Sequence, residues 1–512
     1  MSRLAWNSAV VTCLNILTLV AGLVLYPFIA AHFEARVTDG FFLALTIPWL
    51  IIGPVMNAVS STLIPVLAEC RHRQPGAVGQ LVGSTITYGV GLSAVAAVVV
   101  GALTPLGLTL AGSSLTPDGV DRVVANTFLL LPLIVLQTVT SVLDAASNSA
   151  GCFWLPAGAT FVRQLATFAG IALFKADFGD LSLAAGFTVG AVVHLAVLWA
   201  FWRHAKTEVT LGRQVPSELR IALRLAIPLV IGSAALQVVV LLSRFVAARL
   251  GPGSVTALDY AYRVSNAVIE VTSSGVLLVI LTDWSAAVMN GTSSVLRTKL
   301  RNAMPLVLFT VLPLVFILHA LRSQLLTLWL ASAGVSAAFI ALTAATLGFL
   351  LIGVPLDIAS RVYARVFLVR RDTRILAGVA IGRLALSGAL FFVLAGYLGV
   401  PGIALADVIG ILFVLAGLSL AARRLLEGPV TGLAGPLLRL TAAATGAWVS
   451  AKAIVIVLST FPLVPLIAVV GSAALVVYIL LAWGLGSHEF RTVWEIVFAW
   501  RAGRVQPLRP DP

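Results

Sequence analysis

An otherwise apolar stretch, residues 255–281, carries charged and amide side chains at regular intervals. Asp259 is followed by Arg263, Asn266 and Glu270, at offsets of 4, 7 and 11 residues. Because an α-helix has about 3.6 residues per turn, these offsets put all four side chains on one face. A charge near the centre of a bilayer costs about 2.5–3.5 kcal/mol on insertion scales, so such a face normally contacts protein or water. The spacing therefore predicts one wall of a hydrated cavity.

Similar stripes of polar side chains occupy single faces of three other apolar stretches: Asp39, Thr46, Gly53 and Asn57; Gln137, Ser141, Asp144 and Asn148; and Ser233, Gln237 and Arg244. The alternative is a set of contacts between helices and ion pairs, such as Asp259 with Arg263 at i,i+4 spacing. Because the stripes lie in both halves of the chain, a shared cavity is favoured. The side chains expected to bind a substrate there are Arg263, Asp39, Arg244, Asp259, Glu270, Asn57, Asp144 and Asn266.

The side chains that catalysis or metal binding requires are not grouped in the sequence. The six histidines are scattered over different loops and helix ends, and the three cysteines form no pair at metal-ligand spacing. No HExxH, GxSxG or phosphate-binding GxxxxGK(S/T) sequence occurs. We therefore expect a protein that is not an enzyme and that has no metal site or cofactor. The identity of a coupling ion is left open.

The high hydrophobic content of the chain indicates that the helices carrying these stripes lie in a membrane. The chain has 512 residues, of which 60% are hydrophobic and 10% charged, whereas soluble domains carry about 25% charged residues. A membrane-spanning helix needs about 20 mainly apolar residues. This criterion predicts an all-α polytopic membrane protein with fourteen spans: 8–31, 41–66, 79–103, 123–146, 154–174, 181–202, 221–248, 255–281, 303–321, 336–359, 375–398, 402–422, 434–458 and 462–485.

The distribution of basic residues gives the orientation of these spans. With the N-terminus inside, most arginines and lysines fall in inner loops, and few fall in outer connections. This asymmetry follows the positive-inside rule and predicts that both termini are cytoplasmic. The net charge of +13 is thereby explained by topology, so no nucleic-acid partner is expected. No loop is large enough for the active site of an integral glycosyltransferase or polymerase.

Two stretches of the chain resemble each other and suggest an internal repeat. Phe28-Ile29-Ala30-Ala31 corresponds to Phe245-Val246-Ala247-Ala248, and each is followed by Val-Thr and, further on, by Ser-Ser. Such repeats commonly place a transport site at the interface between halves. The predicted organisation is an N-terminal lobe (1–203), a cytoplasmic linker (204–220), a C-terminal lobe (221–424), two further helices (425–486) and a cytoplasmic tail (487–512). In this tail, His488 to Arg504 has the pattern of an interfacial helix, and a frayed terminus is the alternative.

Prolines recur inside the predicted spans, for example Pro27 in the first and Pro132 in the fourth. In membrane helices a proline permits a kink, because neighbouring groups can satisfy the carbonyl that it frees. Bent helices suit a protein that opens alternately to the two sides of a membrane. The alternative is that these prolines reflect only the general frequency of proline in membrane helices.

The second span and its surroundings resemble the MurJ-type lipid II flippases of the multidrug/oligosaccharidyl-lipid/polysaccharide exporter superfamily. The resemblance rests on Thr38-Asp39-Gly40-Phe41-Phe42, followed by Ile47-Pro48 and by Leu63-Ile64-Pro65 through Glu69. Further matches are Gly253-Ser254-Val255 with Tyr260-Ala261-Tyr262-Arg263, and Leu143-Asp144 through Ser149. The similarity extends from the first span through the twelfth, and the count of fourteen spans agrees.

This resemblance implies two six-helix lobes around a cationic cavity, and two further helices that form a groove for a polyprenyl tail. It also implies flipping of a polyprenyl-diphosphate-linked saccharide across the bacterial cytoplasmic membrane, driven by membrane potential or an ion gradient. By position, Arg263 matches a cavity arginine that contacts the diphosphate, and Asp39 matches an acidic residue that opens the second helix. The implied partners are the lipid-linked saccharide, membrane lipids and proteins of cell-envelope biosynthesis.

The chain departs from the family pattern at positions where the first and second helices usually carry arginine. Leu19, Leu25 and Ile52 stand there, and aliphatic side chains cannot hold a diphosphate through charge-assisted hydrogen bonds. Either Arg244, Arg163 or Arg383 takes that role, or the substrate is a lipid-linked glycan other than lipid II. The alternatives to a flippase are an exporter of another amphiphile, similar to multidrug-extrusion carriers, and a scaffold that has lost transport.

Overall fold

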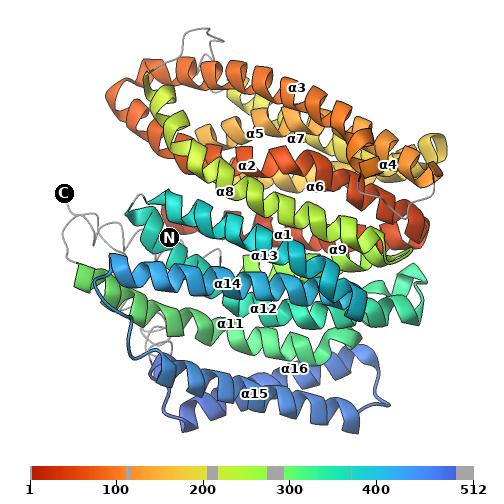
Figure 1. Ribbon diagram of the computed structural model, residues 1–512, viewed down its shortest axis with the longest axis vertical. Coiled ribbons are helices and arrows are strands. Elements are labelled where there is room, and N and C mark those ends of the chain that lie inside the picture. The colour runs from red at the N-terminus through yellow and green to blue at the C-terminus, as the bar shows by residue number, and fades with distance from the viewer. Residues whose placement is uncertain (1–2, 111–116, 205–216, 274–292, 371, 492–512) are drawn as a thin grey trace. The chain divides into compact units, whose positions relative to one another are not determined.

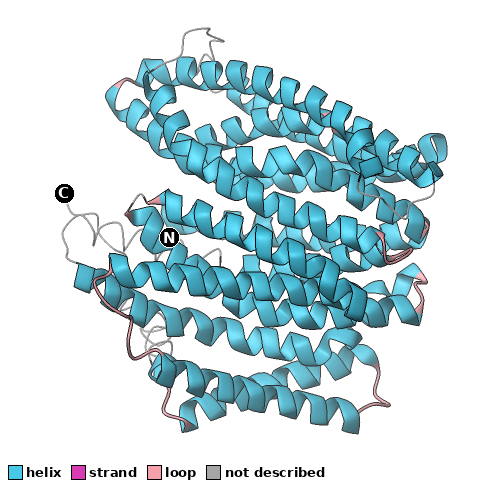
Figure 2. Ribbon diagram, viewed as in Figure 1, coloured by secondary structure: helices cyan, strands magenta, loops and turns pink. Residues whose placement is uncertain are grey.

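The computed structural model describes residues 3–110, 117–204, 217–273, 293–370 and 372–491 (Figure 1). All regular secondary structure in these ranges is helical (Figure 2). The α-helices are α1 (Arg3–His32), α2 (Ala35–Arg73), α3 (Val78–Leu110), α4 (Pro117–Leu130), α5 (Pro132–Ser149), α6 (Trp154–Phe178), α7 (Ser182–His204), α8 (Ser217–Ala248), α9 (Ser254–Ser273), α11 (Ser293–Leu330), α12 (Ala337–Val369), α13 (Thr373–Leu398), α14 (Val400–Leu425), α15 (Ala434–Val457) and α16 (Leu463–Gly484).

Twelve helical stretches among the described residues are long and apolar enough to cross a membrane. One of them, Trp154–Arg203, contains the two consecutive helices α6 and α7. The polar helix α9 is not among the twelve, since three of its 20 residues are Asp259, Arg263 and Glu270. Counting α6 and α7 separately and adding α9 gives fourteen passes, which confirms the fold class and the number predicted from the sequence.

The fourth predicted span, 123–146, differs in detail because it is divided into α4 and α5. Pro132 is the first residue of α5, and its ring nitrogen cannot donate a backbone hydrogen bond to the preceding turn. The carbonyl oxygen that Pro132 leaves without its usual donor is that of Phe128, which accepts from the Leu131 amide at 3.4 Å. Beside it, Thr188 of α7 donates its hydroxyl to the carbonyl oxygen of Leu129 at 2.8 Å.

The helices form two compact units that interleave along the chain. The first contains residues 1–260, 329–339 and 376–406, and the second contains 261–328, 340–375 and 407–512, each with the gaps given above. The division into sequence lobes at 1–203 and 221–424 stays a prediction. The predicted linker, 204–220, and the predicted interfacial helix, 488–504, fall largely outside the described residues.

Small residues allow close packing in the first unit. A side chain at Gly186 of α7 would collide with Ile171 and with the backbone of α6, and Gly190 lies equally close to Thr167. Because lipid tails are as apolar as the helices, membrane helices associate through such close backbone approach and through hydrogen bonds. Trp202 supplies one of these, donating its indole N–H to the Ser147 hydroxyl at 3.0 Å.

The kink proline of α1, Pro27, has its freed carbonyl covered from another helix. In a regular helix the amide of residue 27 would donate to the carbonyl oxygen of Leu23, and proline has no such amide. The indole nitrogen of Trp329 donates to that oxygen instead, at 2.6 Å. Beside it, the Tyr260 hydroxyl donates to the carbonyl oxygen of Tyr26 at 2.8 Å. The backbone of α1 around Pro27 therefore receives hydrogen bonds from two aromatic side chains that are distant in the sequence.

Replacing Trp329 with phenylalanine is expected to lower the thermal stability of the detergent-solubilised protein. An aromatic ring remains, although a smaller one, and the Leu23 carbonyl loses its partner, at a cost of about 1–3 kcal/mol. The midpoint of unfolding, followed by loss of the monodisperse peak in size-exclusion chromatography, should fall by several degrees. The matched control is Trp199→Phe, at an exposed position of α7, which should leave the midpoint unchanged. Equal midpoints for the two variants would contradict the assigned role.

Candidate functional site

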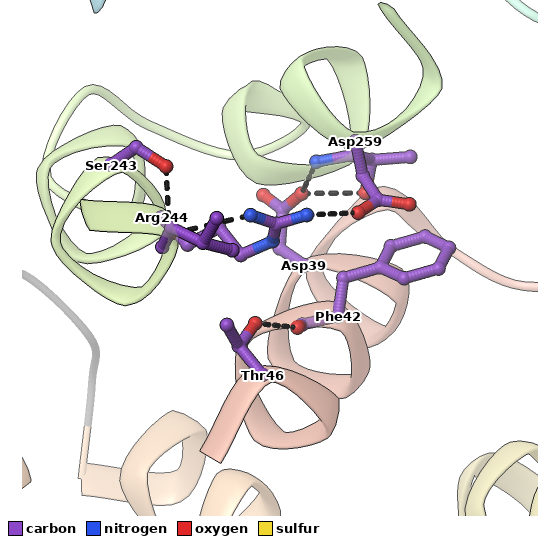
Figure 3. Close-up of polar contacts among 8 residues, drawn as sticks. Asp39, Phe42, Thr46, Ser243, Arg244 and Asp259 are labelled. Atoms are coloured by element: carbon purple, nitrogen blue, oxygen red, sulfur yellow. Dashed lines mark hydrogen bonds and ion pairs between the residues drawn. The ribbon is translucent and has the colours of Figure 1, made fainter. Parts of the chain in front are cut away.

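Asp39, near the start of α2, binds the N-terminal end of α9 (Figure 3). One carboxylate oxygen accepts a hydrogen bond from the backbone amide of Gly253 at 2.6 Å. The other accepts from the amide of Thr256 at 2.8 Å and from its hydroxyl at 2.6 Å. The first amides of a helix have no partner inside the helix and carry partial positive charge, so a carboxylate is the complementary group. Asp39 therefore caps α9 from a helix more than 200 residues earlier in the chain.

The sequence before α9 shapes this contact. Gly251 and Gly253 have φ values of +117° and +86°, a region that favours glycine over residues with a Cβ atom. Together with Pro252 they make a tight turn that directs the Gly253 and Thr256 amides toward α2. The hydroxyl of Thr38 adds a contact with the Thr256 hydroxyl at 2.8 Å. We call Thr38, Asp39, Gly253 and Thr256 the α2–α9 latch.

Arg244 of α8 forms an ion pair with Asp259 of α9, next to the latch (Figure 3). The distance from guanidinium nitrogen to carboxylate oxygen is 2.6 Å, and the two side chains are 12% and 6% exposed. The guanidinium also donates to the carbonyl oxygen of Val240 at 3.3 Å. This ion pair joins Asp259 to a residue 15 positions earlier in the chain.

Breaking this ion pair from one side is expected to destabilise the protein. In Arg244→Ala the Asp259 carboxylate stays buried without its partner, which typically costs about 3–5 kcal/mol. Replacing both residues by apolar ones of similar volume, as in Arg244→Met with Asp259→Leu, is often close to neutral. Unfolding midpoints in detergent should therefore fall for the single variant and recover for the double variant. A double variant as unstable as the single one would show that the pair is not an isolated unit.

The polar stripes of α2 and α8 meet each other along the contact between these two helices. Asn57 donates its side-chain amide to the Ser233 hydroxyl at 2.6 Å. One turn nearer the latch, a side chain at Gly53 would collide with that of Gln237. The two stripes therefore serve as a polar seam between helices, on which the Asn57 side chain remains exposed.

The stripe of α9 has two parts with different environments. Asp259 is buried in the ion pair, whereas Arg263, Asn266 and Glu270 have exposed side chains. The offsets of 3 and 7 residues from Arg263 keep these three on one face of the helix. An exposed cation, amide and carboxylate in a row are suited to a ligand that carries both anionic and hydroxyl groups.

The last predicted site residue, Asp144, lies on α5 and is separate from the latch. It is half-buried, and its Oδ1 atom is buried without a hydrogen-bond partner. Arg163 of α6 lies within electrostatic range of it. The structure thus brings together Asp39, Arg244 and Asp259, and places Asn57 and Asp144 elsewhere. Arg263, Asn266 and Glu270 follow Asp259 along the same helix. The binding roles of all eight residues stay predictions.

Sequence reasoning missed Thr256 and the structural role of Gly253. The sequence Gly-Pro-Gly before Ser254 does indicate that one helix ends and the next begins there, because glycine and proline commonly lie at helix boundaries. A helix starting there needs partners for its first amides, and a carboxylate is the natural candidate. The pattern does not tell which carboxylate supplies them.

The positions at which the family usually has arginine are packed into the protein interior. Leu25 and Ile52 are each 1% exposed, and Leu19 is half-buried. These side chains contribute to the core and offer no polar group to a ligand. Among the described residues, no group of three or more histidine, cysteine, aspartate or glutamate side chains is placed to hold a metal ion.

Comparison with known proteins gives consistent matches over most of the chain. The sequence profile of the lipid II flippase MurJ family matches residues 29–492. Lipid II flippase MurJ of Burkholderia cenocepacia is 26% identical over 413 residues, which cover 77% of this chain and 79% of that protein.

Solved structures show the same fold. An inward-closed conformation of lipid II flippase MurJ superimposes with a TM-score of 0.74 at 17% identity, covering 98% of this chain and 100% of that chain. An inward-facing multidrug resistance transporter of the MATE family has a TM-score of 0.66 at 15% identity, covering 82% of this chain and 98% of that chain. The MurJ structure thus accounts for more of this chain than the MATE structure does.

Proposed function

This chain belongs to the MurJ lipid II flippase family, and we propose that the α2–α9 latch is a gate through which it controls the passage of its lipid-linked substrate. The protein is a multi-pass membrane flippase for a polyprenyl-diphosphate-linked saccharide, lipid II or a related glycan. Alternating access requires a contact that closes one side of the membrane and can be released. The Asp39 carboxylate, which holds three donors at the start of α9, is the observation that carries the proposal.

The latch suits a gate because it is polar. Each hydrogen bond contributes only about 0.5–1.5 kcal/mol net when water can replace the partner. Entry of water therefore releases such a contact at moderate cost, whereas it would not favour separation of an apolar surface. With the N-terminus in the cytoplasm, as the distribution of basic residues predicts, the latch lies at the outer end of α2.

Arg263 is the proposed contact for the diphosphate. Its guanidinium can donate two parallel hydrogen bonds to phosphate oxygens, and its side chain is exposed on α9. Arg244 is the weaker candidate, because its charge is already matched by Asp259 at 2.6 Å. Asn266 and Glu270, on the same face, are suited to sugar hydroxyls.

A reversible cross-link tests the gate. The Thr38 and Thr256 hydroxyls are 2.8 Å apart, so cysteines at these two positions should form a disulfide once Cys13, Cys70 and Cys152 are replaced by serine. In proteoliposomes containing a fluorescent lipid-linked saccharide, oxidation should lower the flipping rate in proportion to the cross-linked fraction. Reduction should restore it. The single variants Thr38→Cys and Thr256→Cys are the controls, and normal flipping by fully cross-linked protein would refute the gate.

The identity of the saccharide requires an experiment in cells. Depletion of this protein should cause one lipid-linked sugar to accumulate on the inner leaflet, and its composition identifies the substrate. Accumulation of none, together with normal growth, would favour the scaffold alternative. Efflux of a drug-like amphiphile by the proteoliposomes, without flipping of any lipid-linked sugar, would favour the exporter alternative, toward which the likeness to the MATE transporter points.

Several further features belong to the same proposal. Both termini are cytoplasmic, and the protein performs no covalent chemistry on its substrate. It needs no cofactor, and an ion gradient or the membrane potential drives it. Proteins of cell-envelope biosynthesis supply the lipid-linked saccharide and take it up after transport.

A further inference from the structure

A cluster of basic and aromatic side chains lies in the second unit. It consists of His319 and Arg322 on α11 and Trp448 and Lys452 on α15. Arg322 and Lys452 lie within electrostatic range of each other. Among the described residues, no carboxylate forms an ion pair with either one. We call these four residues the α11–α15 basic cluster.

The cluster has a fixed arrangement of donors. The indole nitrogen of Trp448 donates to Nδ1 of His319 at 3.0 Å, which places the ring proton of the neutral imidazole on Nε2. Arg322 donates to the carbonyl oxygen of His319 at 2.7 Å. Its side chain also lies against Gly348 of α12, where a Cβ atom would be 3.1 Å from Nε, and Nε is buried without a partner. Arg322 is thus held in place by packing and by His319, while its Nη2 makes no hydrogen bond within the described residues.

Two positive charges held together without an acidic partner are costly within a membrane. Long basic side chains near helix ends commonly extend toward the interface to reduce this cost, and Lys452 is half-buried with room to do so. Arg322 is different, because Gly348 and His319 fix its position. A bound anion would match both charges at once, which neither side chain achieves alone.

The position of the cluster indicates the source of that anion. Lys452 precedes the end of α15 at Val457 by five residues, and Arg322 precedes the end of α11 at Leu330 by eight. At a rise of about 1.5 Å per residue, these cations lie roughly 8 and 12 Å from the helix ends. In helices that cross a membrane, positions this close to an end are expected near the lipid head groups and the adjoining part of the acyl chains. Trp448 at the same level is typical of the membrane interface.

We propose that the α11–α15 basic cluster binds the phosphate of an anionic lipid head group, on the side of the membrane opposite to that of Arg439. Arg322 and Lys452 supply the charge, and His319 and Trp448 hold Arg322 in position. On the predicted orientation this is the outer leaflet. The site is separate from the α2–α9 latch and does not require that the protein flips a lipid.

Lipid binding to the full-length protein tests this site directly. Native mass spectrometry of the purified protein in neutral detergent gives the affinity for added phosphatidylglycerol, phosphatidylcholine or undecaprenyl diphosphate. Lys452→Gln should weaken phosphatidylglycerol binding about fivefold, as expected for one cation near a lipid surface. Binding of zwitterionic phosphatidylcholine should not change. Lys452 makes no hydrogen bond within the described residues, so the substitution leaves the Arg322–His319 contact intact.

Control variants and the choice of lipid distinguish a site for anionic lipid from a site for the transported lipid. Arg249→Gln removes one cation that lies over the Phe392 ring in the first unit, and it should leave lipid affinity unchanged. Arg322→Lys should retain more binding than Arg322→Gln. Weakened binding of undecaprenyl diphosphate alone would assign the site to the transported lipid. Equal affinities of Lys452→Gln and the unmodified protein for both anionic lipids, or equal losses in Lys452→Gln and Arg249→Gln, would overturn the proposal.

Discussion

Alanine in place of Asp39 should slow lipid flipping by at least about a hundredfold, which corresponds to roughly 2.7 kcal/mol. The substitution removes the acceptor for the Gly253 amide, the Thr256 amide and the Thr256 hydroxyl. Each buried donor left without a partner costs about 1–3 kcal/mol. The closed state of the latch loses this energy, whereas a state in which water reaches the donors does not. The measurement is the initial flipping rate in proteoliposomes, normalised to the inserted protein.

Two further variants should slow flipping less than Asp39→Ala does. Thr256→Val removes only the hydroxyl contact and keeps the side-chain volume and the Thr256 amide, so its loss should be less than about tenfold. Asp39→Asn retains one acceptor oxygen but loses the negative charge that favours a helix N-terminus, so its rate should lie between the other two. Asp39→Ala protein that flips at the unmodified rate would exclude the latch from the transport cycle. A loss explained by a smaller amount of inserted protein would assign Asp39 a folding role only.

Alanine at Arg263 should reduce flipping to background while membrane levels stay normal. Removing one partner of a desolvated charge pair costs roughly 2–5 kcal/mol, because the remaining charge is left without its match. Here the remaining charge is on the lipid diphosphate. The Arg263 side chain is exposed on α9, so truncation removes little packing and should leave folding intact. Flipping in proteoliposomes and the amount of protein in isolated membranes are measured together.

Control substitutions distinguish a specific contact from general loss of charge. Arg122→Ala removes an exposed arginine whose ion pair with Asp180 spans 3.3 Å, and exposed pairs contribute only about 0–1 kcal/mol. It should flip normally. Arg263→Lys should retain partial activity, because it keeps the charge and loses the bidentate geometry. An unchanged flipping rate in Arg263→Ala would refute the assignment of Arg263 as the contact for the diphosphate.

Much of the architecture could be predicted from composition and periodicity. The length of the apolar stretches predicts the number of spans. The charges of α9 exclude it from a simple hydropathy criterion, but its length and the placement of its polar residues on one face still predict a span. At Pro27, the freed carbonyl accepts a hydrogen bond from another group, as is generally expected for prolines in membrane helices. These predictions succeeded because they depend on local sequence and on the thickness of the bilayer, both of which act on each helix separately.

The contacts between distant residues could not be predicted in the same way. The pattern around Asp39 indicates a carboxylate on a polar helix face. Its partners, however, are backbone amides 214 and 217 residues later. Because every residue type except proline has a backbone amide, the sequence does not identify which amides bind. Arg244 and Asp259 were each selected as site residues, yet the pairing of one with the other depends on how α8 and α9 approach each other. Arg322 and Lys452 belong to no polar stripe along their own helices, and only the packing of α11 against α15 relates them to each other.

The buried pair of Arg244 and Asp259 has an electrical consequence. Its charges cancel over 2.6 Å, so when α8 and α9 move together the pair carries no net charge through the transmembrane field. A voltage of 100 mV does about 2.3 kcal/mol of work on each elementary charge that crosses. That work is therefore exerted on the diphosphate of the cargo, and the voltage dependence of flipping should report the charge of the cargo more than that of this ion pair.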